Sequence, residues 1–399
     1  TTGLSALELQ SPARAWFHQV LRTFKRNLSL CGVFQLQETP RAINFATLHF
    51  QKNQDGKLQV NMTVQSNMGS PARNAWRFTY TLTQANSKHT GRVLASLVHE
   101  HFTGDPGSFL NPIVAVKKIV DRKTGKPFSQ LVLLAMDGSL LQVLTKGSFD
   151  NVLPSFSPDG CSLFYTSYER NNPDLVRMDL RTKQRFVIFK QPGMSMGASC
   201  FPSGDIAFTH SPVGGKSNLY RLGMPFSNVL PKPFFNPLAL GLNTSIHVHP
   251  QGKSILFVSD RLGSPRIYAM DADGSNARRV VAEGTFQLSP RFIPPHGKRF
   301  LFVARDQQSK QMDIFVARLP QGQEAQKNRF ATLMPALTQN QGDNLEPYPS
   351  PDGRLITFIS TRIKGKQEIY VSTMDGNYQR RITSNGPYFT PVWGSLCKE

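Results

Sequence analysis

The sequence predicts a small α/β domain over residues 1–108, followed by an all-β six-bladed β-propeller over residues 109–399 that the C-terminal strand closes. Two observations lead to this fold class. A short turn motif recurs through the C-terminal two-thirds of the chain at the spacing of propeller blades. The first hundred residues lack that repeat and combine two helical patterns with three strand patterns.

The recurring motif is a Pro-x-Gly turn that follows a short apolar strand. Ser-Pro-Asp-Gly occurs at residues 157–160 and again at residues 350–353, with degenerate copies between them. The motif prolines, 44, 48, 45 and 56 residues apart, are Pro158, Pro202, Pro250, Pro295 and Pro351. A four-stranded blade takes about 40–50 residues, so this period predicts blades. Proline fixes φ and glycine supplies positive φ, and together they specify tight hairpins.

The number of blades follows from the strands left over at the two ends of the repeat. Five complete four-stranded units begin near residues 153, 198, 246, 290 and 346. Three strand patterns precede the first unit, at residues 112–118, 130–135 and 140–145, and one follows the last, at residues 389–393. Three strands plus one make a sixth blade, which removes open sheet edges.

The first domain is predicted from its hydrophobic periodicities. Ser11-Pro12, followed by apolar residues at helical spacing, predicts an amphipathic helix with proline in its first turn. A strand meander is predicted at residues 43–50, 58–64 and 76–82, and a second helix at residues 87–102. We also expect edge strands at residues 4–10 and 31–36, and a junction to the propeller at residues 103–107.

Composition narrows the classes of partner. The net charge of +20 favours acidic partners, unless the source lineage makes basic proteins throughout. No run of about eighteen apolar residues predicts a bilayer-spanning segment. The chain starts at Thr1 without a leader pattern, which indicates a processed or trimmed product. The pairing of the cysteines stays open between one disulfide and four free thiols, at Cys31, Cys161, Cys200 and Cys397.

Enzymatic motifs are weak, and we predict no catalytic residue, metal or cofactor. Residues 193–197 match G-x-S-x-G but lie between two blades, without the strand–turn–helix elbow that this pattern needs. His247 and His249 have the spacing of two metal ligands on one strand, yet no third ligand is evident. The inner strands otherwise offer as acid–base groups Arg291, Glu346 and Tyr348. The alternative to a non-enzymatic binding protein is a hydrolase or lyase with its site in the central channel.

The order of a small α/β domain and six such blades resembles the TolB family, the periplasmic propeller proteins of the Tol–Pal system in Gram-negative envelopes. The resemblance is carried by the Ser-Pro-Asp-Gly turns, the stretch from Ser259-Asp260 to Ile267-Tyr268, the closing segment 386–393 and the helix end at residues 102–104. It implies a non-enzymatic periplasmic protein that binds the peptidoglycan-associated lipoprotein Pal through its propeller. Outer-membrane integrity and cell division are the processes that such a protein supports.

The resemblance also concerns further partners. Family members bind the inner-membrane protein TolA through a flexible N-terminal extension, but here only residues 1–3 precede the first predicted strand, so engagement of a TolA-like protein stays open. Only charge points to nucleic acid, and no recognition motif accompanies it, so nucleic acid is not expected as a partner. A closed propeller leaves no edge that demands a neighbour, and we expect a monomer.

Strand order predicts which loops share a face of the propeller. The Pro-x-Gly and Asp-Gly turns share one end and carry Asp159, Asp273, Asp352 and Asp375. The loops between second and third strands share the other end, here called the mouth, with the connections between blades. These loops are rich in Lys and Arg, which would steer an acidic partner. We expect the partner site at the mouth, formed by Met194, Gly197, Thr244, Ser245, Arg261, Arg266, Gln287, Arg305, Asn344, Glu346, Arg362 and Tyr388.

Overall fold

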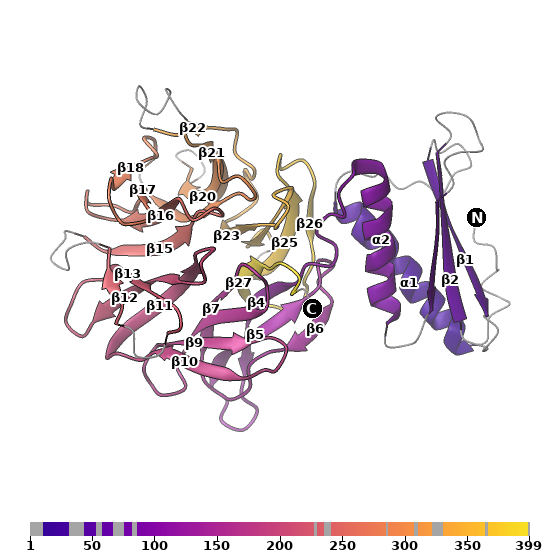
Figure 1. Cartoon of the computed structure of the whole chain (residues 1–399), viewed down its shortest axis with the longest axis horizontal. Helices are drawn as coiled ribbons and strands as arrows, with labels where there is room; N and C mark the ends of the chain where they lie inside the picture. The colour runs from indigo at the N-terminus through magenta and orange to yellow at the C-terminus, as the bar shows by residue number, and fades with distance from the viewer. Residues whose placement is uncertain are drawn as a thin grey trace. The chain divides into compact units, whose positions relative to one another are not determined.

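The computed structural model describes residues 11–31, 44–52, 58–66, 76–81, 86–226, 230–234, 241–284, 286–306, 310–320, 330–363 and 366–397. Contacts between Cα atoms divide the chain into two compact units, Thr1–Leu110 and Asn111–Glu399 (Figure 1). The domain boundary between residues 108 and 109 stays a prediction. None of the described helices is both long and apolar enough to cross a membrane.

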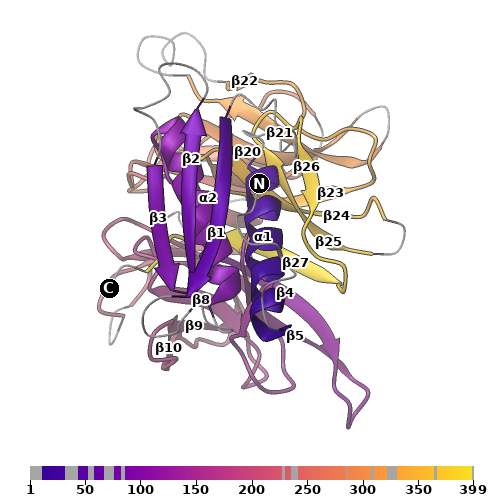
Figure 2. The ribbon, with the colours of Figure 1, turned by 90° about the vertical axis from the view of Figure 1, so that its right-hand side faces the viewer.

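The N-terminal unit contains two helices and a three-stranded antiparallel sheet (Figure 2). The helices are α1 (Ser11–Leu30) and α2 (Ser87–Thr103). The sheet has the order β1-β2-β3 and consists of β1 (Asn44–Lys52), β2 (Leu58–Ser66) and β3 (Trp76–Thr81). The two predicted helices and the predicted strand meander are confirmed. The expected edge strand at residues 4–10, and all but the first residue of the one at 31–36, lie outside the described residues.

Apolar side chains at helical spacing pack α1 against α2. Val20, Phe24 and Leu28 are buried on one face of α1, as the helical period requires. Gly91 of α2 permits a close approach, because a Cβ atom there would lie 2.7 Å from the carbonyl oxygen of Val20. Helix α2 ends at Gly104, whose φ of 74° is the left-handed conformation that glycine adopts without a steric penalty.

The second unit consists, in its described residues, of six four-stranded antiparallel sheets. The first complete blade has β7 (Asn151–Phe156), β8 (Ser162–Ser167), β9 (Asp174–Asp179) and β10 (Arg185–Phe189). The next two blades consist of β11 (Gly193–Cys200), β12 (Ile206–Pro212), β13 (Asn218–Leu222) and β14 (Lys232–Pro233), then β15 (Asn243–Val248), β16 (Ser254–Ser259), β17 (Arg266–Asp271) and β18 (Arg278–Arg279). Two more consist of β19 (Gln287–Phe292), β20 (Arg299–Arg305), β21 (Met312–Arg318) and β22 (Thr332–Leu333), then β23 (Asn344–Pro349), β24 (Leu355–Ser360), β25 (Glu368–Thr373) and β26 (Gln379–Arg381).

The sixth blade joins the two ends of this unit. Strand β27 (Tyr388–Trp393) pairs with β4 (Ile113–Val120), and β5 (Pro127–Leu134) and β6 (Leu140–Val143) complete the sheet. Each innermost strand contacts those of both neighbouring blades, and β27 contacts β23 and β7, so the blades form the closed ring seen in Figure 1. The predicted six blades and their closure by the C-terminal strand are confirmed.

A disulfide bond reinforces this closure. Cys161 in the β7–β8 turn is bonded to Cys397, which follows β27, across a sequence separation of 236 residues. The connection requires close packing, because a Cβ atom on Gly160 would lie 2.2 Å from the carbonyl oxygen of Ser395. The sequence left the cysteine pairing open, and the structure resolves it as one bond that does not involve Cys31 or Cys200.

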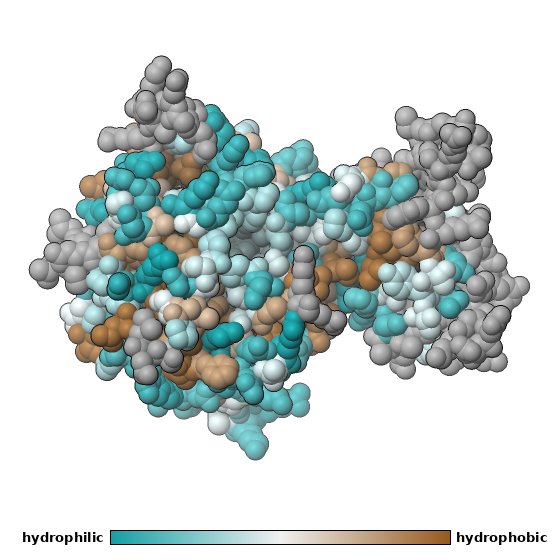
Figure 3. All heavy atoms as spheres, in the orientation of Figure 1, coloured by the Kyte–Doolittle hydropathy of each residue, from teal (hydrophilic) through white to brown (hydrophobic). Residues whose placement is uncertain are grey.

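The propeller core lies between neighbouring blades and is rich in aromatic side chains. All six residues of β8, and all six of β24, are buried. Phe257, Phe302 and Phe358 on second strands stack on aromatic rings of third strands, with centroids 5.6, 5.6 and 5.7 Å apart. On the face shown in Figure 3, hydrophobic residues of this unit form separate patches among hydrophilic ones. The innermost strands are therefore backed by buried second strands, on the side away from the centre of the ring.

Candidate binding channel and mouth

The six innermost strands share one irregularity at one position. Their pairing with the second strand skips two residues, as between Val152 and Ser155 in β7 and between Leu345 and Tyr348 in β23. The first skipped residue has positive φ in every one of these strands: Leu153, Gly197, Ser245, Ser289, Glu346 and Thr390. The residue after it is often proline, which has no N–H for the ladder. Such a bulge bends the strand and redirects its side chains.

These bulges line a central channel with a volume of about 560 Å³. The positive-φ residues form an outer ring toward the mouth. Two residues further along each strand, an inner ring consists of Ser155, Ser199, His247, Arg291, Tyr348 and Val392. The volume lies in the range of roughly 300–1,000 Å³ that is typical of small-molecule sites.

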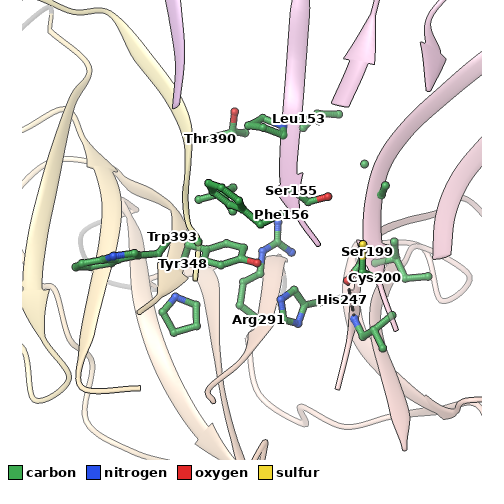
Figure 4. Close-up of a pocket in the computed structure, with 18 of the residues that line it drawn as sticks. Leu153, Ser155, Phe156, Ser199, Cys200, His247, Arg291, Tyr348, Thr390 and Trp393 are labelled. Carbon is green, nitrogen blue, oxygen red and sulfur yellow. Dashed lines mark hydrogen bonds between the residues drawn. The ribbon is translucent and has the colours of Figure 1, made fainter. Parts of the chain in front are cut away.

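Three polar side chains of the inner ring meet in this channel from adjacent blades (Figure 4). The ring centroids of His247 and Tyr348 are 5.9 Å apart, and Cζ of Arg291 lies 5.8 Å from the Tyr348 centroid. The guanidinium of Arg291 donates from Nη1 to the carbonyl oxygen of Pro290 at 2.8 Å. Nδ1 of His247 accepts the backbone N–H of Phe292 at 3.2 Å.

Burial sets the protonation of this group. Burial, then the charge of Arg291, then His249, lower the pKa of His247 well below its usual value, so the imidazole is neutral. Because Nδ1 is an acceptor, the proton of the neutral ring is on Nε2. Burial raises the pKa of Tyr348, against the opposing charge of Arg291, so its hydroxyl keeps its proton.

Glu346 of the outer ring has a carboxylate that is held by the closing blade. Its Oε2 accepts the backbone N–H of Thr390 at 2.5 Å. Burial raises the pKa of Glu346, while this hydrogen bond and the charge of Arg291 lower it. The ion pairs found among the described residues do not include Glu346 with Arg291. The carboxyl group therefore influences the arginine of the neighbouring blade without forming an ion pair with it.

The predicted partner residues other than arginine fall into three settings. Those that line the channel are Gly197, Thr244, Ser245 and Glu346, and Met194 near the start of β11 is 45% exposed. The others are buried, at 0%, 0% and 3% exposure: Gln287, Asn344 and Tyr388. The part of these three residues in partner binding stays a prediction.

Arg261 is one of two predicted partner residues that lie against their own blades. Its Nε donates to Oγ of Ser259 and its Nη2 to Oδ1 of Asn243, both at 2.9 Å. Its Cζ lies 4.7 Å from the ring centroid of Tyr268. The arginine thus ties the loop after β16 to three strands of the blade.

Arg362 repeats this arrangement in blade β23–β26. It donates to Oγ of Ser360 at 2.9 Å and to Oδ1 of Asn344 at 3.3 Å, and its Cζ lies 4.2 Å from the Tyr370 centroid. A further bond, at 2.8 Å, goes to Oε1 of Gln379. Burial lowers the pKa of Arg261 and of Arg362. We call these two side chains the arginine struts.

The other two predicted arginines differ in the hydrogen bonds that their guanidinium groups make. Arg266 donates to the carbonyl oxygen of Gly284. Arg305 is exposed and lies over Phe286, with Cζ 5.3 Å from the ring centroid. Among the described residues, its guanidinium makes no hydrogen bond. Of these two arginines at the mouth, Arg305 therefore has the charge that is more available to a partner.

At the opposite end of the propeller, acidic residues form the turns. The carboxylates of Asp159, Asp273, Asp352 and Asp375 each accept the backbone N–H two residues further on, at 2.9, 2.9, 3.1 and 3.1 Å. Hydrogen bonds from Ser275 lower the pKa of Asp273, and those from Thr373 and Asn377 lower the pKa of Asp375. These carboxylates specify hairpin geometry through their own backbone.

The G-x-S-x-G stretch, expected between two blades, instead forms the first part of strand β11. Ser195 is 0% exposed, and its Oγ lies 3.0 Å from Nδ1 of His210. Burial lowers the pKa of His210. A buried serine in the middle of a strand is not a nucleophile elbow, which presents its hydroxyl at a sharp turn. The described residues contain no group of three or more His, Cys, Asp or Glu side chains that could hold a metal ion.

Comparison with known proteins agrees with this architecture. The family model "TolB beta propeller domain" matches residues 99–330, more than half of the chain. The chain belongs to the TolB β-propeller family. The Acinetobacter baumannii TolB crystal structure superposes on this TolB-family chain with a TM-score of 0.76 at 19% identity, over 94% of this chain and 93% of that one. At that identity the likeness shows the fold.

Curated TolB relatives are distant in sequence. A TolB homolog from Chlorobium luteolum is 25% identical over 287 residues, which are 67% of this chain and 63% of that protein. The Tol-Pal system protein TolB from Bordetella pertussis is 27% identical over 195 residues, 49% of this chain and 42% of that protein. This TolB-family chain therefore matches less than two-thirds of the length of either relative.

Proposed function

We propose that this TolB-family chain is a non-enzymatic, periplasmic protein-binding component of a Tol–Pal envelope system. Its propeller mouth binds a Pal-like peptidoglycan-associated lipoprotein, and this attachment supports outer-membrane integrity and cell division. The observation that carries the proposal is the family match, together with a complete ring of blades whose mouth opens into a lined channel. The Bordetella pertussis relative is itself named as a Tol-Pal system protein.

The chemistry of the mouth suits a protein partner. Met194 provides an exposed apolar side chain near the channel opening, and Thr244 and Ser245 provide polar groups on the channel wall. An apolar anchor beside polar groups is the usual composition of a protein-binding site. The exposed Arg305 adds a positive charge that would speed association with an acidic partner.

The disulfide supports the proposed compartment. Bonds such as Cys161–Cys397 persist in oxidising environments, including the periplasm, and are rare where thiols are kept reduced. The proposal includes no TolA-like partner, because residues 1–10 lie outside the described residues. A monomeric state stays a prediction.

A channel enzyme is the weaker alternative. An acid and a base must reach the same reacting atoms to act together. The Ser195 hydroxyl is buried inside a blade, and the carboxylate of Glu346 is held by the backbone of Thr390. The polar groups in the channel are better suited to holding a molecule than to exchanging protons with it.

Two methionines of nearly equal exposure provide a matched test of the mouth. Met194 is 45% exposed at the mouth, and Met224 is 48% exposed after β13, at the opposite end of its blade. We expect Met194→Lys to weaken binding of the soluble domain of a Pal-like lipoprotein about tenfold or more in isothermal titration calorimetry. Met224→Lys should change the affinity less than twofold. Equal losses in both variants, or no binding by the parent chain, would contradict the proposal.

Charge reversal at Arg261 or Arg362 is a poorer test. Both side chains hold their blades together through hydrogen bonds and ring contacts. A loss of binding in those variants would report a disturbed blade as well as a lost contact. The methionine pair avoids this ambiguity because each side chain is about half exposed.

A further inference from the structure

We propose that His247, Arg291 and Tyr348 form a binding site for a small carboxylate inside the propeller channel. The three residues come from the adjacent innermost strands β15, β19 and β23 and share the inner ring (Figure 4). The proposal goes beyond partner binding at the mouth and does not depend on it. Its basis is that each residue directs a hydrogen-bond donor into the channel while the protein leaves that donor unused.

Arg291 supplies the charge of this site. A guanidinium has five N–H donors, and the described residues provide it with one hydrogen bond, to the carbonyl oxygen of Pro290. Its Nε is buried and has no partner. No carboxylate among the described residues forms an ion pair with it. A largely desolvated cation without a counter-ion is costly, so an anion in the channel would be stabilised there.

His247 and Tyr348 supply two neutral donors beside this charge. Nδ1 of His247 is occupied by the N–H of Phe292, which leaves Nε2–H as the free donor of the neutral ring. The Tyr348 hydroxyl makes no hydrogen bond with a described residue. Their ring centroids lie 5.9 Å apart, so one small anion can reach both groups and the guanidinium.

The shape and charge of the channel select a monocarboxylate. A carboxylate only accepts hydrogen bonds, and its two oxygens match the guanidinium fork. Glu346 lies in the outer ring and acts electrostatically on Arg291, which disfavours a second negative charge on the ligand. The walls above the site include the rings of Pro154, Pro347 and Pro391, which suit a compact apolar body.

The test compares benzoate with benzamide, which has nearly the same shape but no charge. Isothermal titration of the whole chain should show benzoate bound about tenfold or more tightly than benzamide. Arg291→Gln should weaken benzoate binding about tenfold, since it removes a charge-assisted hydrogen bond. Arg122→Gln, which removes an equal charge at an exposed position that does not line the channel, should change the affinity less than twofold. Equal binding of the two probes, or equal losses in the two variants, would overturn the proposal.

Tyr348→Phe keeps the test decisive if Arg291→Gln does not fold. It removes only a hydroxyl and should weaken benzoate binding about three- to tenfold, whereas an unchanged affinity would refute the site. A final arm distinguishes two sources of the carboxylate. Binding of benzoate alone assigns a free small acid, and binding of acetyl-Gly-Asp-Gly-amide as well assigns an acidic side chain of a docked chain.

Discussion

Blades β15–β18 and β23–β26 secure the mouth end of their innermost strands differently from blade β11–β14. In the first two, an arginine strut bridges the pairs Asn243–Ser259 and Asn344–Ser360. In blade β11–β14, the pair is Ser195–His210, whose side chains contact each other directly at 3.0 Å. All three pairs lie opposite each other at equivalent positions of the strand ladder.

The difference shows that different residues can meet the same structural requirement in different blades. The fold requires a buried polar pair at the mouth end of each of these innermost strands, and several residue types can satisfy it. A strut also fastens the loop after the second strand, whereas the Ser195–His210 contact joins two strands only. The stability of the two strut blades should therefore depend on an arginine charge. The stability of blade β11–β14 should depend on the protonation of the His210 imidazole.

We expect loss of the ring closure to lower the unfolding free energy more than loss of any contact within one blade can. The Cys161–Cys397 bond ties the closing blade to its neighbour across 236 residues. We expect the double variant Cys161→Ser/Cys397→Ser to lose about 2–5 kcal/mol of unfolding free energy in urea titrations. The upper end of this range exceeds the loss expected from any single strut, because the closure is shared by the whole ring.

A reductant provides the control for this prediction. Dithiothreitol should lower the stability of the parent chain to that of the double variant and leave the double variant unchanged. Cys200→Ser should keep the full response to reductant, since Cys200 is a free thiol outside the bond. A parent chain that is insensitive to reductant would show that β27–β4 pairing alone closes the ring.

The two struts differ in geometry, which sharpens the comparison. Arg362 donates to Oε1 of Gln379 as well, and its Cζ lies 4.2 Å from the centroid of its tyrosine ring, against 4.7 Å for Arg261. We expect Arg362→Ala to cost about 2–3 kcal/mol of unfolding free energy and Arg261→Ala about 1–2 kcal/mol. Urea titration of both variants measures the difference.

Arg305→Ala is the matched control for the struts. Arg305 is exposed and lies over Phe286 without a side-chain hydrogen bond to a described residue, so its loss should cost about 0.5 kcal/mol or less. If Arg261, Arg362 and Arg305 gave equal losses, the hydrogen bonds to serine and asparagine would not be what stabilises these blades.

The sequence predicts the ring better than the site within it. The Pro-x-Gly turns and the three-plus-one strand count predict six blades, because turn chemistry is local and repeats. The bulges were missed, although proline after the positive-φ residue, as in Glu346-Pro347, was a visible signal. The Cys161–Cys397 pair could not be predicted, since its proximity exists only after the ring has closed.

Tertiary contacts give two of the predicted partner residues a structural role that residue type did not indicate. Arg261 and Arg362 suggest a partner surface in a basic chain, yet their guanidinium groups hydrogen-bond within their own blades. Arg291, Tyr348 and His247 were recognised as inner-strand polar residues. Their convergence depends on the spacing of three adjacent blades, which the sequence does not specify.

The Ser195–His210 contact of blade β11–β14 should depend on pH, because an imidazole titrates. Burial lowers the pKa of His210 in the folded chain, whereas the unfolded chain keeps a pKa near about 6.5. The unfolded state therefore binds more protons below that pH, and acidification from pH 7.5 to 5.5 should reduce stability through this residue by about 1.4 kcal/mol at most. His89, His247 and His249 also have lowered pKa values, so a variant must isolate the contribution.

His210→Asn isolates it, because asparagine still offers a hydrogen-bonding group to Ser195 but does not titrate. Urea titrations at pH 7.5 and 5.5 should show a smaller loss of stability for this variant than for the parent chain. Arg362→Ala should retain the parent pH dependence while being less stable at both pH values, since its strut carries no titrating imidazole. An unchanged pH dependence in His210→Asn would mean that the Ser195–His210 contact tolerates a protonated ring. The two kinds of blade would then differ in geometry alone.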